Sequence, residues 1–167
     1  ANLIAVAEDN IPVLGIANFP ALAERLTAAT GHGCTWSAPH HPPAPARVSD
    51  QNKTDHAIIE ITRPKTFAKK SLKHLFDELA LATAKTRGWS DAYAFALVAT
   101  GRIDAAIALR MNIWDVAPFQ PIVTEAGGTI TEWDGTTPIT GASTLATNKS
   151  LHEPLQQIID NAEEKTT

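Results

Sequence analysis

Two aspartates, Asp91 and Asp115, stand at positions where chemistry could occur, because each begins a predicted helix directly after a turn. A carboxylate at such a position can accept hydrogen bonds from the free amides of the first helical turn, and spacing alone favours this capping role for both residues. A carboxylate can also bind a hard metal cation through its oxygens. Asp115 is therefore a candidate metal ligand, although one carboxylate cannot hold a catalytic metal cluster.

The segments that carry these acids alternate between apolar strands and amphipathic helices. Gly101 is a typical helix terminator, and Pro118 falls in a first helical turn, where its missing amide costs nothing. The pattern predicts strands over 57–62, 83–87, 103–109, 129–133 and 143–146, and helices over 67–81, 91–100, 115–126 and 150–162. Alternation of this kind indicates an α/β fold.

The first third of the chain is predicted to be rich in β-structure. Apolar runs at 3–7 and 13–17 flank the turn signal at 8–10, which predicts a hairpin of two central strands. A further strand is predicted over 25–29, followed by the turn Gly31-His32-Gly33 and the segment 34–36. The proline-rich stretch 38–47 predicts an exposed loop that forms neither helix nor strand. We therefore expect one partial domain over 1–167, β-rich over 1–65 and α/β over 66–167.

Three other groups of polar residues have a chemical and a structural interpretation, and the structural one is favoured for each. His40-His41 could bind a metal, but no third ligand lies nearby at a recognisable spacing, which favours a solvated loop. Lys69, Lys70, Lys73 and His74 could form a phosphate-binding patch, but they fit the solvated face of an amphipathic helix better. Glu125 fits a surface or helix-terminal residue better than a catalytic one.

Length and composition limit the class of protein. A chain of 167 residues with 44% hydrophobic residues can form a single domain or a large piece of one. The net charge of -4 argues against general nucleic-acid binding, and the single cysteine, Cys34, excludes an intrachain disulfide. No apolar run reaches the ~18 residues of a membrane span, so we expect a cytoplasmic protein. Because residues 1–6 read as a core strand and not as a signal sequence, we expect the domain to have begun further upstream.

The motif around Asp115 resembles a known family. Trp114-Asp115-Val116-Ala117-Pro118, followed by Pro121 to Gly128, is similar to the carboxyl-terminal signature of the inositol monophosphatase family of metal-dependent phosphatases. Segments 86–93 and 97–102, with Met111-Asn112, resemble its bacterial histidinol-phosphate phosphatase branch. Segments 3–6 and 12–15 resemble the family's hairpin, and 29–34 its small-residue turn.

This resemblance implies both a fold and a set of site residues. The chain would be the carboxyl-terminal part of a layered α/β/α/β/α sandwich in which Mg²⁺ ions activate water and neutralise phosphate. Asp115 would be one metal ligand, and Arg87 would lie close to the substrate. Ser90 and Asp91 would lie beside the organic part of the substrate, where Asp91 could pair with an amine. The resemblance assigns no catalytic residue to this chain.

Two departures from the family pattern keep alternatives open. The family's glutamate pair and its Asp-Pro-Ile-Asp-Gly-Thr loop, which supply most of the metal ligands, are not found in the sequence. Ala108 stands where relatives carry an acid that contacts the substrate, and Ser90 stands where this branch commonly has glycine. The leading hypothesis is a magnesium-dependent phosphomonoesterase for histidinol phosphate whose amino-terminal metal-binding half is missing from this chain.

The other hypotheses are an inositol monophosphatase, an inactive family member that binds a phosphorylated ligand or a protein partner, and a purely structural role for both aspartates. A small phosphorylated metabolite is the expected partner, and nucleic acid and membrane are not expected. We also expect a homodimer, because the hairpin over 3–17 would expose apolar faces.

Overall fold

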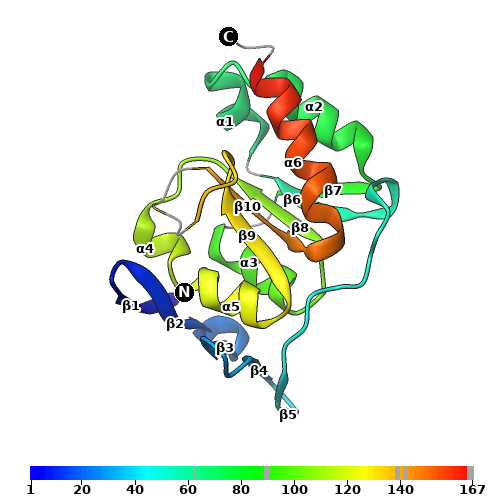
Figure 1. The fold of residues 1–167 in the computed structure, drawn as a ribbon. Helices are drawn as coiled ribbons and strands as arrows, with labels where there is room; N and C mark the ends of the chain where they lie inside the picture. The colour runs from blue at the N-terminus through cyan, green and yellow to red at the C-terminus, as the bar shows by residue number, and fades with distance from the viewer. Residues whose placement is uncertain (62, 89–90, 138–139, 141–142, 165–167) are drawn as a thin grey trace.

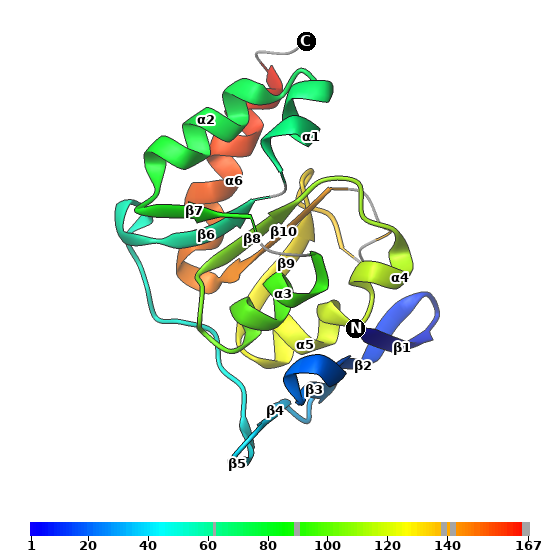
Figure 2. The ribbon, with the colours of Figure 1, turned by 180° about the vertical axis from the view of Figure 1, so that it is seen from behind.

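The protein folds into two five-stranded sheets with helices between them and outside one of them (Figure 1). The computed structural model describes residues 1–61, 63–88, 91–137, 140 and 143–164. Helices α3 (Asp91–Ala99) and α5 (Phe119–Glu125) lie between the sheets, as the view from behind also shows (Figure 2). Helices α1 (Pro64–Lys69), α2 (Lys73–Ala82) and α6 (Lys149–Glu164) cover the outer face of the second sheet. The predicted layered α/β fold is confirmed.

The first sheet is antiparallel and follows chain order. Its strands are β1 (Asn2–Glu8), β2 (Ile11–Phe19), β3 (Glu24–Ala29), β4 (Cys34–Ala38) and β5 (His41–Pro45). Asp9 and Asn10 close the predicted hairpin with φ values of 48° and 66°, as its two-residue turn requires. The prediction that both hairpin strands are central is wrong for β1, which lies at the edge of the sheet and is largely exposed.

The proline-rich segment is not the predicted loop, because part of it forms the edge strand β5. Residues 41–45 pair with β4 in a register that joins Thr35 to Pro45 and Trp36 to Ala44. An edge strand tolerates proline, because the side of the strand that lacks an amide can face solvent without breaking the sheet. The ring of His41 stacks on Trp36 at 6.4 Å, which gives this histidine a structural contact.

The second sheet is mixed and has the order β7-β6-β8-β10-β9. Its strands are β6 (Ile58–Ile61), β7 (Lys85–Arg87), β8 (Ala105–Ala108), β9 (Gly128–Glu132) and β10 (Thr144–Asn148). Strand β6 is parallel to β7 and to β8, whereas β10 is antiparallel to β8 and β9. The carboxyl ends of β6, β7 and β8 therefore meet at one edge, which we call the carboxyl edge.

The helix predicted over 67–81 is two helices. The chain leaves the helical path between α1 and α2, where Ser71 takes a left-handed φ of 62°. The amides of Lys70 and Leu72 both donate to the Phe67 carbonyl across this break. The turn brings the fully buried Phe67 against Phe76 at 5.7 Å, so packing overrides the continuous helical pattern.

The helix predicted over 115–126 is also divided, into α4 (Ile113–Val116) and α5. Pro118 follows α4 and has no amide with which to continue its hydrogen bonds. Pro121 lies in the first turn of α5, where an amide would have no partner within the helix. Two prolines three residues apart thus favour two short helices over one long helix.

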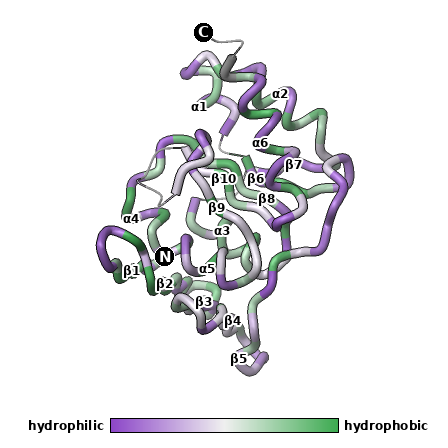
Figure 3. The backbone as a smooth tube through the Cα atoms, in the orientation of Figure 1, coloured by the Kyte–Doolittle hydropathy of each residue, from purple (hydrophilic) through white to green (hydrophobic). Residues whose placement is uncertain are grey.

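Two hydrophobic cores lie on the two faces of the second sheet. One fills the space between the sheets, and it surrounds α3 so completely that residues 94–99 are all buried. The other lies beneath α1, α2 and α6. Strands β6 and β8 are correspondingly hydrophobic, whereas the segment that leads into β6 is hydrophilic (Figure 3). Among the described residues, no helix combines the length and apolarity that crossing a membrane requires.

A polar cluster ties α3 to the first sheet. Arg102, which follows α3, donates to both carboxylate oxygens of Glu24 at 2.7 and 3.0 Å and lies over the rings of Trp36 and Tyr93. Burial raises the pKa of Glu24, but hydrogen bonds from Arg102, Trp36 and Tyr93 and the charge of Arg102 outweigh it and hold that pKa below its usual range. The charge pair therefore fixes the first sheet against the helix layer.

Glu125 ties α5 to the same sheet. Its carboxylate accepts the amides of Gly31 and Gly33 at 2.8 and 2.7 Å, in the turn between β3 and β4. The predicted helix-terminal position of Glu125 is confirmed, and its role is to hold this turn. Burial first and the Glu125 charge second raise the pKa of Cys34 to about 12, so this thiol stays protonated at neutral pH and is a poor nucleophile.

Candidate functional site

The sequence-predicted site residues follow two of the parallel strands at the carboxyl edge. Arg87 is the last residue of β7, and Asp91 is the first residue of α3, which comes next in the chain. Asp115 lies in α4, which follows β8. The fourth predicted residue, Ser90, lies outside the described residues. Ligands of open α/β sheets bind outside the carboxyl ends of parallel strands, so topology brings these residues to the edge where a site is expected.

Arg87 is exposed and close to the start of α1. Its Nη1 donates to the Thr86 carbonyl at 2.7 Å, a contact that leaves the positive charge without an acidic partner among the described side chains. Arg87 lines a pocket of 130 Å³ together with Ile61 and Pro64, which come from the end of β6 and the start of α1. A cationic side chain in this place can attract an anionic group.

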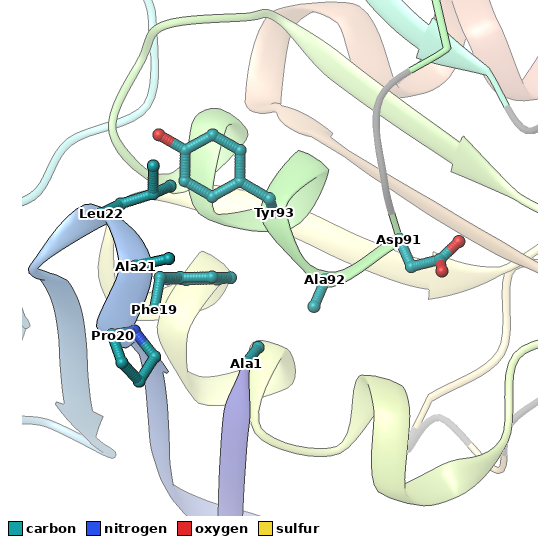
Figure 4. A pocket seen from close by; sticks show the side chains of 8 residues that line it. All are labelled: Ala1, Phe19, Pro20, Ala21, Leu22, Asp91, Ala92 and Tyr93. Carbon is teal, nitrogen blue, oxygen red and sulfur yellow. The ribbon is translucent and has the colours of Figure 1, made fainter.

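Asp91 lines a different pocket, of 480 Å³, whose walls are mostly apolar. Phe19, Leu22 and Tyr93 contribute to these walls, and the Asp91 carboxylate points away from the rings of Phe19 and Tyr93 (Figure 4). The residue is exposed and has a φ of 25°, an uncommon value for a residue other than glycine. Its carboxylate is thus accessible at the amino end of α3.

Asp115 is the third residue of α4, so the prediction that it begins its helix is wrong. Its Oδ2 accepts the backbone amide of Asn112 at 3.3 Å and the side-chain amide of the same residue at 3.2 Å. Together the two residues form a capping box, in which the third helical residue reaches back to the residue before the helix. Asp115 is half-buried, and its carboxylate retains lone pairs that these two contacts do not use.

A metal site cannot be completed from the described residues. Among them, no three His, Cys, Asp or Glu side chains lie close enough together to hold a cation. His40 lies in the turn before β5, and His41 is the first residue of that strand. Asp115 has the right chemistry for one Mg²⁺ ligand, but a metal bound there needs ligands from elsewhere.

Sequence reasoning overlooked two buried acids on the inner face of the second sheet. Glu60, near the end of β6, is 4% exposed and is in register with Arg87 on β7 and Ala106 on β8. Glu132, at the end of β9, is 8% exposed and accepts both the amide and the hydroxyl of Thr140. For Glu60 the available signal was an acid inside an otherwise apolar strand, since buried acids need specific partners.

Ala108 ends β8 at the same edge and is itself buried. Its register partner on β10 is Thr144, whose hydroxyl is fully buried and has no hydrogen-bond partner in the described part of the chain. The small Ala108 side chain therefore offers this neighbouring hydroxyl no polar contact.

The sequence matches the inositol monophosphatase family over residues 1–165. The histidinol-phosphatase of Mycobacterium tuberculosis is 33% identical over 153 residues, covering 92% of this chain and 59% of that protein. The histidinol-phosphatase of Chlorobaculum parvum is 31% identical over 96% of this chain and 61% of its own length. The chain thus spans about three fifths of the length of these relatives.

Solved structures agree with the sequence match. An inositol monophosphatase from Zymomonas mobilis superposes with a TM-score of 0.84 at 27% identity, over 95% of this chain and 61% of that one. The Thermotoga maritima IMPase TM1415 gives a TM-score of 0.82 at 25% identity, over 98% of this chain and 61% of its own. Fold, sequence match and the motif around Asp115 lead to one assignment. The chain belongs to the inositol monophosphatase family.

Proposed function

We propose that this protein is a magnesium-dependent phosphomonoesterase that acts on histidinol phosphate. The observation that carries the proposal is the placement of Arg87 at the end of β7, of Asp91 at the start of the next helix, and of Asp115 after β8, since β7 and β8 are parallel strands on either side of β6. The carboxyl edge of such strands is where α/β proteins bind ligands. Both curated relatives described above are named histidinol-phosphatases, which supports this substrate within the family.

Each residue has a proposed part in binding. Asp115 contributes one carboxylate to Mg²⁺, which when bound can supply an activated water and neutralise phosphate charge. Arg87 attracts the phosphate through its exposed guanidinium, and Asp91 and Ser90 contact the organic part of the substrate. This chain matches about three fifths of its relatives, and the remaining metal ligands are proposed to come from a counterpart of the other two fifths. We call this chain together with that counterpart the full-length protein.

Replacing Asp91 with asparagine tests the assignment of the substrate. Histidinol phosphate carries an amine, and a charged hydrogen bond to Asp91 is worth about 1.5–3 kcal/mol, so KM for this substrate should rise roughly 10- to 100-fold. The KM for inositol phosphate, which has no amine, should change less than about threefold. Initial rates of the full-length protein with both substrates measure this difference. Asp50→Asn, at an exposed loop position, is the matched control.

Several outcomes would redirect the proposal. Equal losses on the two substrates would remove the role given to Asp91, and faster hydrolysis of inositol phosphate would favour the inositol monophosphatase alternative. Absence of turnover on either ester in the metal-loaded, full-length protein would favour a binding role without catalysis.

We also propose that the protein is a homodimer. Support comes from the edge position of β1 and from the exposed side chains of Ile4, Val6 and Ile11, which are 53%, 49% and 50% accessible. Apolar side chains beside an unpaired strand edge favour association. Sedimentation equilibrium measures the mass directly, and a monomer across the micromolar range would contradict this proposal.

A further inference from the structure

Positive charge is concentrated in one short part of this acidic protein. Residues 61–76 contain no Asp or Glu, and they include Arg63, Lys65, Lys69, Lys70 and Lys73. We call residues 63–73 the basic segment. The rest of the chain contains nine of the fourteen Lys and Arg residues and all eighteen Asp and Glu residues. Its formal charge is therefore -9. The basic segment is therefore the region to which an anion would be drawn.

The basic segment begins at the carboxyl edge. It follows β6 directly and forms α1, which lies beyond the end of that strand in both views (Figures 1 and 2). Pro64, the first residue of α1, lines the same 130 Å³ pocket as Arg87. The start of the basic segment thus lies close to Arg87, a residue that we place beside the substrate.

The charges of the basic segment lie on α1, at its two ends and at the start of α2. Phe67 is fully buried and anchors α1 against Phe76 and Trp133. Lys65, Lys69 and Lys70 are exposed, and none of them forms an ion pair with a described acid. Lys73 pairs with Asp77 at 2.5 Å, but an exposed pair of this kind neutralises little.

We propose that the basic segment collects phosphorylated substrate and guides it toward Arg87 at the carboxyl edge. This inference rests on the proposed phosphatase function. A local positive surface on a negative protein raises the nearby concentration and the association rate of an ester with a dianionic phosphate group, by about 10-fold or more. Salt removes the effect, because the screening length falls to about 3 Å at 1 M. A merely solvated helix face would give no such dependence.

The test replaces three charges and varies the salt concentration. The triple variant Lys65→Gln, Lys69→Gln and Lys70→Gln preserves helix propensity, since glutamine and lysine are nearly equal in that respect. A control triple, Arg25→Gln, Lys53→Gln and Lys149→Gln, removes the same charge at exposed positions elsewhere. In the full-length enzyme, kcat/KM for histidinol phosphate at low ionic strength should fall about 5- to 20-fold in the first triple variant and less than about twofold in the control.

Two readouts separate this inference from the proposed function. The loss in the first triple variant should vanish above about 0.5 M salt with kcat unchanged, and equal losses in both triples would overturn the inference. Inorganic phosphate, titrated into the 167-residue chain at low salt, should shift the backbone amide resonances of residues 63–73 more than those elsewhere. Such shifts in the chain, together with no turnover by the full-length protein, would support the basic segment while the phosphatase proposal failed. Shifts spread evenly over the chain would overturn the inference about the basic segment.

Discussion

Alanine in place of Gly15 is expected to lower the free energy of unfolding by about 3 kcal/mol or more, because there is no room at this position for even one added methyl group. A Cβ atom there would lie 2.0 Å from the Pro118 carbonyl oxygen and 3.1 Å from Cγ of Pro121. The closest of these atoms belongs to backbone, which cannot rotate away as a side chain can. Strand β2 and the start of α5 would have to separate.

Urea unfolding measures the Gly15→Ala effect, and Gly88→Ala is its control. A Cβ at Gly88 would meet only the Ile61 carbonyl oxygen, at an ordinary 3.8 Å, so this change should cost less than about 1 kcal/mol. Since Pro118 follows Asp115 by three residues, a shift at Gly15 should also disturb the candidate metal ligand. Equal stability of the two glycine variants would show that the packing of α5 on β2 is looser than described.

Asparagine in place of Asp115 is expected to cut magnesium-dependent turnover of the full-length enzyme about 100-fold or more. A bound metal stabilises the charge of the transition state by several kcal/mol, and Asp115 is proposed as one of the ligands that hold it. Magnesium affinity should weaken together with turnover. Stability should change by less than about 1 kcal/mol, because the asparagine oxygen can still accept the Asn112 amide. Magnesium titrations of the initial rate, together with thermal unfolding, measure these three quantities.

The matched variant Asn112→Ala separates the structural role of Asp115 from the metal-binding one. It removes the side-chain contact of 3.2 Å but leaves the carboxylate in place. It should therefore cost about 1 kcal/mol of stability and retain most of the activity. If Asp115→Asn changed stability alone, like this control, the capping interpretation would hold and the metal role would be wrong.

The fold was largely predictable where hydrophobic patterning and turn residues agreed. The hairpin around Asp9-Asn10 and the helix that stops just before Gly101 follow from local chemistry, and both are present. The errors occurred where tertiary contacts decide the outcome. Strand β5 exists because β4 offers it a partner, and α1 separates from α2 so that Phe67 can pack on Phe76 and Trp133.

The candidate site was predictable in its residue types but not in its contacts. The turn-to-helix positions of Asp91 and Asp115 were visible in the sequence, because acids recur at such boundaries. The pairing of Asp115 with Asn112 depends on where α4 begins, which shifted by two residues from the predicted start. The burial of Glu60 depends on the neighbouring strands β7 and β8, which flank its own strand, and this pairing is not encoded locally.

The central claim is that the carboxyl edge supplies one part of a magnesium-dependent phosphatase site and that Asp115 is its metal ligand. Phosphate release from histidinol phosphate tests it most directly, measured with and without Mg²⁺ for the 167-residue chain and for this chain joined to the unmatched two fifths of the M. tuberculosis histidinol-phosphatase. The account predicts release by the joined protein only, and loss of that release with Asp115→Asn. Magnesium-dependent release by the 167-residue chain alone, or undiminished release by the joined Asp115→Asn variant, would contradict it.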